Sequence, residues 1–194
     1  MTKLIGFGGK LASGKDTAAD YLVEEYGWIK LNMSAPLHEA MLALNPLVPV
    51  EFKYGTGHWR YSDLVDKVGY TDAKKNPEVR RLLQALGTEV GRNMFSENVW
   101  IDIAAGNIDS FRDQGYNVAI TGIRFPNEVD MIHQDRGHGA PGELVWVDRP
   151  GLESAEQALA SHSSESMDAA WFDRTLVNDG SLDDLYTKVD KDFA

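Results

Sequence analysis

Hydrophobic and polar residues follow two kinds of pattern along this chain. Short apolar runs that stop at glycine or at polar residues occupy 3–9, 28–34, 116–123, 142–148 and 174–180. Runs of this length, bounded by turn-forming residues, are typical of buried strands. Apolar residues recur with helical spacing at 16–27, 35–44, 62–69, 77–95, 96–115, 126–134 and 181–193. Strands separated by helices predict an α/β fold with a doubly wound parallel sheet.

Two stretches depart from this alternation. Residues 45–62 are rich in turn-forming and aromatic residues. The segment 77–95 starts with proline, which suits the first turn of a helix, and carries an apolar stripe that begins at Val79. Gly87 and Gly91 lie inside this segment, and glycine weakens a helix interior. We therefore expect a helix over 77–95 that is weakest near these two glycines.

Composition limits the classes of protein to consider. The chain has 194 residues, 43% of them hydrophobic, which is enough for one domain with a sheet covered on both faces. A formal charge of −11 argues against binding to a nucleic acid backbone, which needs a concentrated basic surface. There are no cysteines, so disulfides are excluded. The N-terminal apolar run is too short for a signal peptide core or a membrane span, and we expect a soluble, cytoplasmic protein.

The stretch "GGKLASGKDT" (8–17) nearly matches the phosphate-binding pattern G-x-x-x-x-G-K-S/T. Gly9, Gly14 and Lys15 comply, but Asp16 stands where the hydroxyl residue belongs and Thr17 follows one place late. Glycines let backbone N–H groups curl around phosphate oxygens, and the following helix N-terminus favours an anion. The alternative is an ordinary glycine-rich turn before a helix. We assign ATP binding to Gly9, Lys10, Ala12, Ser13, Gly14, Lys15, Asp16 and Thr17.

Six segments together carry a family resemblance. In order, "GKLASGKDTAADYL", "RLLQALGTEVGRNMF", "ENVW", "ITGIRFPNEVDMI", "HSSE" and "LVNDGSLDDLY" resemble the bacteriophage deoxynucleoside monophosphate kinases, and only about 46–75 contributes little. The resemblance implies ATP-dependent phosphoryl transfer to a deoxynucleoside monophosphate with Mg²⁺, and a homodimer. It implies one P-loop kinase domain over 1–194, with a helical acceptor-binding region at about 35–115 and a lid at about 149–167. A GKD sequence followed by threonine is usual there, so Asp16 fits the family.

The segment after the strand at 116–123 departs from the family pattern. Similar proteins usually have aspartate at the place of Gly122, so the obvious strand-end carboxylate for a metal is missing. Arg124 matches the family arginine and is predicted to hold phosphate in catalysis, with Glu128 as its acidic partner on the acceptor side. Strand ends in such sheets line the ligand crevice, which favours a functional Arg124. The alternative is that Arg124 and Glu128 form a structural ion pair at a helix start.

The acceptor nucleotide is expected to bind on the helices that precede this strand. Arginine suits a monophosphate because its planar fork binds two oxygens together. Arg80 and Arg81 point about 100 degrees apart on a helix, so we assign Arg81 to the ligand and expect the other to be solvated or paired with Glu78. Gln84 and Glu89 are candidates for reading the base or sugar, or are surface residues. The remaining candidates on these helices are Arg92 and Trp100.

Three further predictions concern the C-terminal third. The segment that follows the strand at 142–148 resembles the lid of a nucleoside monophosphate kinase, and Arg149 is expected to reach the transferring phosphoryl group. His162 and Glu165 match the family's histidine–serine–glutamate element and are assigned to the acceptor, with a loop-capping His162 as the alternative. Asn178 and Gly180 are assigned to ATP. Their turn is equally expected to cap the last helix through Asp179 or Ser181.

Asp16 is the candidate metal ligand. Magnesium prefers oxygen ligands and keeps several waters, so Asp16, with Thr17 beside it, is predicted to hold Mg²⁺ in place of the missing strand-end carboxylate. The competing hypothesis is that Asp16 only favours the positive helix end and screens Lys15.

Two other functions remain open at this point. One is a small-metabolite P-loop kinase that resembles dephospho-coenzyme A kinase. The other is a nucleotide-binding switch without acceptor-dependent catalysis.

Overall fold

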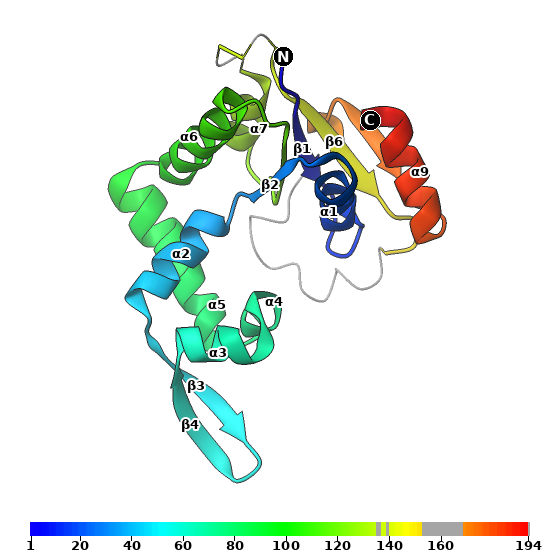
Figure 1. Cartoon of the computed structure of the whole chain (residues 1–194). Coiled ribbons are helices and arrows are strands. Elements are labelled where there is room, and N and C mark those ends of the chain that lie inside the picture. Colours follow the sequence, from blue (N-terminus) through cyan, green and yellow to red (C-terminus); the bar gives the residue numbers. More distant parts are fainter. Residues whose placement is uncertain (135–136, 139, 153–168, 194) are drawn as a thin grey trace. The chain divides into compact units, whose positions relative to one another are not determined.

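The computed structural model describes residues 1–134, 137–138, 140–152 and 169–193 (Figure 1). The chain divides into two compact units. The first unit contains Met1–Met33 and Ile103–Ala194, and the second contains Ser34–Asp102. The first unit therefore comes from two separate stretches of sequence, and the second is inserted between them.

A parallel sheet forms the centre of the first unit. Its described strands are β1 (Leu4–Gly8), β2 (Ile29–Asn32), β5 (Val118–Thr121), β6 (Glu143–Asp148) and β7 (Arg174–Val177). Their order is β2-β5-β1-β6-β7, and each neighbouring pair is parallel. The central β1 is flanked by β5 on one side and β6 on the other, which is the kind of switch point where open α/β sheets bind ligands.

Helices cover both faces of this sheet, so the predicted doubly wound fold is confirmed. On one face, Ile5 and Phe7 of β1 pack with Leu22 of α1 (Lys15–Tyr26) and Val189 of α9 (Leu182–Phe193). On the other face, a side chain added at Gly6 would collide with Ile123 and Leu144 and would contact Ile132 of α7 (Pro126–His133). The alternation of Ile5, Gly6 and Phe7 thus fits a strand buried on both sides. A short 3₁₀ helix, Ala169–Trp171, precedes β7.

The second unit is mainly helical and has its own core. Its elements are α2 (Ala35–Leu44), β3 (Leu47–Phe52), β4 (Gly55–Arg60), α3 (Tyr61–Val68), α4 (Tyr70–Ala73), α5 (Pro77–Gln84) and the π-helix η1 (Ala85–Phe95). The helix α6 (Val99–Asp113) begins in this unit, and its residues from Ile103 belong to the first. Met41, Val48, Tyr61 and Val79 are buried together at the centre.

Two features of the second unit go beyond the periodicity of the sequence. The stretch rich in turn-forming and aromatic residues forms the antiparallel hairpin β3–β4, in which Phe52 and Trp59 pack edge to face. The expected weakness of the helix over 77–95 is confirmed, because the α-helix ends at Gln84 and continues as a π-helix. None of the helices in the described part of the chain is both long and apolar enough to cross a bilayer.

Candidate active site

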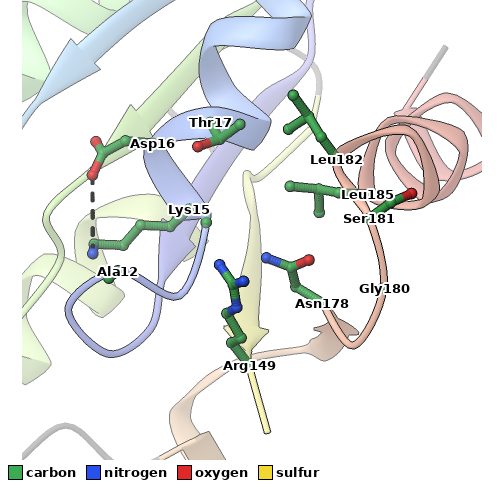
Figure 2. Close-up of a pocket in the computed structure, with 11 residues that line it drawn as sticks. Ala12, Lys15, Asp16, Thr17, Arg149, Asn178, Gly180, Ser181, Leu182 and Leu185 are labelled. Carbon is green, nitrogen blue, oxygen red and sulfur yellow. Dashed lines mark ion pairs between the residues drawn. The ribbon is translucent and has the colours of Figure 1, made fainter. Parts of the chain in front are cut away.

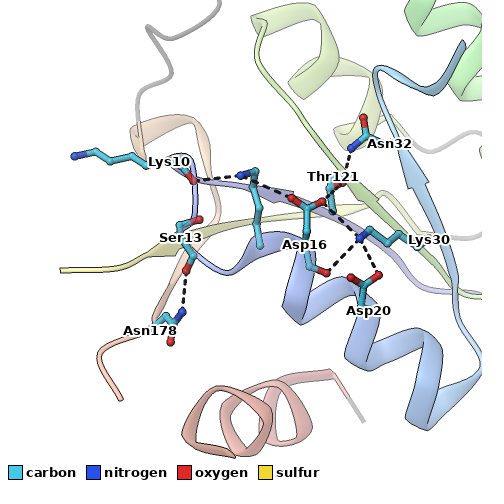
Figure 3. A network of polar contacts seen from close by, with 9 residues as sticks. Lys10, Ser13, Asp16, Asp20, Lys30, Asn32, Thr121 and Asn178 are labelled. Carbon is cyan, nitrogen blue, oxygen red and sulfur yellow. Dashed lines mark hydrogen bonds and ion pairs between the residues drawn. The ribbon is translucent and has the colours of Figure 1, made fainter. Parts of the chain in front are cut away.

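The glycine-rich loop joins β1 to α1 at the centre of the sheet. Gly14 has a φ of 103°, and a Cβ there would lie 2.5 Å from Nδ2 of Asn178. That amide, at the end of β7, donates to the carbonyl of Ser13 at 2.8 Å (Figure 3). The N–H of Ser13 donates in turn to the carbonyl of Lys10 at 3.1 Å. Only glycine allows both this backbone conformation and the close approach of Asn178. A hydrogen bond from Asn178, at the end of β7, therefore holds the loop.

Lys15 directly follows this loop and is the first residue of α1. Its side chain is only 16% exposed, and its ammonium donates to the carbonyl of Lys10 at 3.2 Å. The same ammonium lies 3.9 Å from Oδ2 of Asp16 (Figure 2). An ammonium at the start of a helix, beside a curled loop, is what a phosphate-binding loop requires. The predicted geometry at Gly14 and Lys15 is thus present, although phosphate binding itself stays a prediction.

Asp16 occupies the first turn of α1, where a negative charge is favoured by the helix dipole. Its carboxylate is 52% exposed. Oδ1 accepts a hydrogen bond from the hydroxyl of Thr121 at 2.9 Å and lies 3.6 Å from the ammonium of Lys30. The helix starts at Lys15 with Gly14 as its N-cap and without a side-chain cap, so Thr17 is not the cap of α1.

A pocket of about 400 Å³ opens beside the loop (Figure 2). The loop and α1 supply one wall, and Arg149, just after β6, and Asn178, just after β7, supply another. The third wall is the start of α9. The lining residues are Ala12, Gly14, Lys15, Asp16, Thr17, Arg149, Asn178, Gly180, Ser181, Leu182 and Leu185. Most of the predicted ATP residues therefore share one cavity with the predicted lid arginine, while Gly9, Lys10 and Ser13 belong to the same loop.

The turn after β7 caps the helix α9 through Ser181, which is one of the two residues predicted for this cap. The hydroxyl of Ser181 accepts from the N–H of Asp184 at 3.2 Å, and the carboxylate of Asp184 accepts from the N–H of Ser181 at 2.8 Å. These bonds to Ser181 lower the pKa of Asp184. Asp179 instead pairs with Lys188 at 2.6 Å, and this hydrogen bond lowers the pKa of Asp179. Contact of Asn178 and Gly180 with ATP stays a prediction.

Arg124 and Glu128 lie between β5 and α7. Glu128 is 4% exposed, and its Oε2 accepts from the backbone N–H groups of Arg124 at 2.6 Å and Phe125 at 3.2 Å. Glu128 therefore stabilises the start of α7 through the backbone of Arg124. The side chain of Arg124 is exposed. Neither the phosphate role of Arg124 nor the acceptor role of Glu128 is tested by these contacts.

The other acceptor candidates belong to the second unit. Arg81, and not Arg80, makes the pair with Glu78, through bonds of 2.7 and 2.8 Å. This pair lowers the pKa of Glu78 and raises that of Arg81. The indole N–H of Trp100 donates to the carbonyl of Gly87 in the π-helix at 2.8 Å. Gln84 and Glu89 are exposed, and Arg92 is half-buried.

These contacts change the expected use of two side chains. The pairing with Glu78 was expected of whichever arginine did not face the ligand, whereas the fork of Arg81 is the one engaged. The indole N–H of Trp100 is likewise engaged in a hydrogen bond within the second unit. Acceptor binding by either residue stays a prediction. His162 and Glu165, and nearly all of the predicted lid, lie outside the described residues.

Some residues of this site were not predicted from the sequence. Thr121 and Asn32 end two neighbouring strands; Thr121 donates to Asp16 at the start of α1, and Asn32 donates to Thr121. Ser181, Leu182 and Leu185 line the pocket from α9. The one available signal was position, because polar residues at the carboxyl ends of parallel strands gather at one edge of the sheet.

Comparison with known proteins adds independent information. A family model described as deoxynucleotide monophosphate kinase matches residues 56–189. The deoxynucleotide monophosphate kinase of Escherichia phage RB69 is 26% identical, covering 97% of this chain and 98% of the relative. A putative deoxynucleotide monophosphate kinase of Acanthamoeba polyphaga mimivirus is 28% identical, over 96% of this chain and 93% of the relative.

Among solved structures, the dephospho-CoA kinase of Campylobacter jejuni has a TM-score of 0.51 at 14% identity. The match covers 98% of this chain and 95% of that protein. At this identity the likeness concerns the fold, which is that of a P-loop kinase.

Proposed function

Because the chain belongs to the deoxynucleotide monophosphate kinase family, we propose that it transfers the γ-phosphoryl group of ATP to a deoxynucleoside monophosphate. The family match spans both units, and the relatives are matched over nearly their whole length. The products are ADP and the deoxynucleoside diphosphate.

The observation that carries this proposal is the pocket beside the glycine-rich loop. Backbone N–H groups of the loop and the start of α1 would bind the phosphates of ATP, and Lys15 would neutralise the β- and γ-phosphates. The lining residues from Asn178 to Leu185 would contact the nucleoside part of ATP. Arg149 projects from the end of β6 into the same pocket, where a positive charge would stabilise the transferring phosphoryl group (Figure 2).

The residues at this site fit Mg²⁺. Mg²⁺ is usually bound by one or two carboxylates plus substrate phosphates, and it keeps several waters. Asp16 offers an exposed carboxylate beside the phosphate lysine, with Thr17 next in the same turn. No group of three or more histidine, aspartate or glutamate side chains placed to share a cation occurs in the described part of the chain. When bound, the metal would supply neutralising charge to the phosphates.

Residues of the second unit are the candidates for binding the acceptor. Arg92 and Arg81 are the candidates for the monophosphate, and Gln84, Glu89 and Trp100 for the nucleoside. Their contribution is positioning, since phosphoryl transfer depends mainly on placing two nucleotides and stabilising charge. The resemblance also implies a homodimer, which stays a prediction.

A coupled ADP-release assay tests this function directly. The purified chain is mixed with ATP and Mg²⁺ and screened against deoxynucleoside monophosphates, ribonucleoside monophosphates and dephospho-coenzyme A. We expect ADP release that depends on a deoxynucleoside monophosphate. Lys15→Ala is the matched control, and it should abolish turnover while the protein stays folded, because the lysine faces the loop and not the apolar core.

The other functions give different results in the same assay. Stimulation by dephospho-coenzyme A alone would identify a small-metabolite kinase, for which the fold likeness at 14% identity is the present support. ADP release that no monophosphate stimulates would identify a nucleotide-binding switch. Near wild-type transfer by folded Lys15→Ala would refute the phosphate-binding role of the loop.

A further inference from the structure

Three side chains form a hydrogen-bonded chain from the edge strand to the phosphate loop (Figure 3). Nδ2 of Asn32, at the end of β2, donates to the hydroxyl of Thr121 at 2.9 Å. That hydroxyl, at the end of β5, donates to Oδ1 of Asp16 at 2.9 Å. The chain therefore joins two strand ends to the first turn of α1.

The position of Thr121 fixes the direction of its proton. Thr121 is 0% exposed, so its hydroxyl does not share its hydrogen bonds with bulk water. A hydroxyl has one proton to donate, and it accepts with its lone pairs. Here the amide of Asn32 donates to one of these lone pairs. The proton of Thr121 is thus directed to Asp16.

The contacts of Asp16 differ between its two carboxylate oxygens. Thr121 and the ammonium of Lys30 both address Oδ1, and Asp20 holds that ammonium at 2.8 Å. Oδ2 is instead the oxygen nearest to Lys15, at 3.9 Å. Lys15 is the lysine proposed to meet the phosphates, so the contacts at Oδ1 turn Oδ2 toward the phosphate side of the loop.

This arrangement exchanges two residue types of the usual P-loop. In P-loop nucleotide hydrolases, Mg²⁺ is held by a hydroxyl residue in the loop and an aspartate at a strand end. Here the carboxylate, Asp16, is in the loop, and the hydroxyl, Thr121, is at the strand end. The next residue, Gly122, has a φ of 83°, and a Cβ there would lie 3.2 Å from Oδ1 of Asn32. The backbone at 122 therefore disfavours any side chain, a carboxylate included.

We propose that Thr121 and Asn32 are positioning residues for magnesium, acting through Asp16. Their hydrogen bonds hold Oδ1 so that Oδ2 faces the cation shared with the ATP phosphates. Partners that orient a metal ligand in this way affect metal affinity strongly, because the ligand otherwise samples other rotamers. This inference rests on the proposed function only in taking ATP with Mg²⁺ as the bound substrate.

The test measures binding, so it does not depend on turnover. ATP is titrated into the full-length protein by calorimetry, once with saturating Mg²⁺ and once with EDTA. The ratio of the two dissociation constants gives the gain in ATP affinity that comes from the metal. For Thr121→Val we expect this gain to fall roughly 10-fold, the lower end of the range for such partners, with ATP affinity in EDTA unchanged.

Two further variants keep the test sound if the buried valine impairs folding. Thr121→Ser retains a hydroxyl and should restore the metal-dependent gain. Asn32→Ala, at a half-buried position, should reduce the gain in the same direction but less. The matched control is Asn117→Ala, which removes a side-chain bond to the N–H of Lys3 at the opposite end of β5 and should leave the gain unchanged.

Two results would overturn the inference. One is an unchanged metal-dependent gain in folded Thr121→Val and Asn32→Ala. The other is an equal loss of ATP affinity with Mg²⁺ and with EDTA, which would show that the hydrogen bonds serve the shape of the loop. If ATP binds as expected but no monophosphate is phosphorylated, the proposed reaction fails while this inference stands.

Discussion

At the scale of single residues, Asp16 combines an exposed charge with a fixed orientation. The hydroxyl of Thr121 holds one oxygen, while the other lies toward Lys15. Asp16→Asn keeps the size of the side chain and an oxygen for Thr121, but it removes the negative charge. We expect a clearly higher Mg²⁺ concentration for half-maximal rate, with partial rescue at saturating metal, because a neutral amide is a weaker ligand for a hard cation. The measurement is initial rate against Mg²⁺ at fixed ATP.

The opposite result has a specific meaning. An unchanged Mg²⁺ dependence in Asp16→Asn would leave Asp16 as a residue that only stabilises the positive end of α1. Thermal unfolding of the same variant then reports that stabilisation separately.

Arg149 is the second residue whose role the pocket makes testable. It is exposed at the end of β6 and shares the cavity with Lys15 and Asn178. Arg149→Ala should lower kcat by about 10²–10³-fold with a smaller effect on the KM of the acceptor, as expected of a charge that acts in the transition state. Steady-state kinetics with both substrates varied separates the two constants. A rise in KM alone would make Arg149 a binding clamp or a surface residue.

At the scale of elements, Gly122 at the end of β5 and Gly106 within α6 can be compared by the same substitution to alanine. Gly122 has a positive φ of 83° and lies against Asn32, so alanine there is strained. Gly106 lies within α6, and a Cβ there would meet no atom within 4 Å. Gly122→Ala should destabilise the protein by about 1–2 kcal/mol. Gly106→Ala should stabilise it by about 0.5–1 kcal/mol, because alanine loses less entropy in a helix.

Denaturant unfolding of the two variants checks both signs at once. The same change of one hydrogen to a methyl group is made in each, so the difference reports the local backbone. Equal effects of the two substitutions would contradict the argument from the backbone at Gly122.

At the scale of the whole molecule, His38 is expected to link stability to pH. Its Nδ1 lies 2.9 Å from the hydroxyl of the buried Tyr61, and its ring stacks on Tyr70 at 3.9 Å. Burial lowers the pKa of His38 from its ordinary value of 6.5, and the charge of Lys74 lowers it further, against a smaller opposite effect of Glu39. The unfolded chain therefore takes up a proton on this histidine at a higher pH than the folded chain does. Stability is full above about pH 6.5 and is lost as the pH falls toward the folded pKa.

Thermal midpoints measured between about pH 7.5 and pH 5.5 test this expectation. The wild type should lose more stability over this range than His38→Gln, in which the titrating group is absent. His58→Gln, at an exposed position on β4, is the control and should follow the wild type. Parallel profiles for the wild type and His38→Gln would show that another group sets the dependence.

The overall charge bears on binding at this same scale. The chain carries −11, yet the proposed ligands are polyanions. Lys10, Lys15 and Arg149 are gathered at or beside the loop, whereas salt screens charges beyond about 8–10 Å. A local group of cations can therefore dominate over a distant acidic surface.

Much of this protein could be predicted from local patterns in its sequence. The apolar runs at 3–9 and 116–123 became the buried strands β1 and β5, because a strand covered on both faces needs a continuous apolar segment. The spacing of Gly9, Gly14 and Lys15 identified the loop, because such a turn needs glycine at fixed positions. The ordered set of family segments identified the kinase family, which the comparisons confirm.

The tertiary structure decided which distant residues meet. Thr121 is 105 residues from Asp16 and 89 from Asn32 in sequence, and it meets both because β5 lies between β1 and β2 in the sheet. By contrast, the pairing of Arg81 with Glu78 follows from helical spacing, because residues three apart on a helix are neighbours, whereas Glu78 and Arg80 are only two apart and do not face each other. Periodicity reports which face of an element is buried, but it carries no information on strand order. The orientation of Asp16 is set by that order, and so the sequence by itself named this carboxylate without showing what holds it.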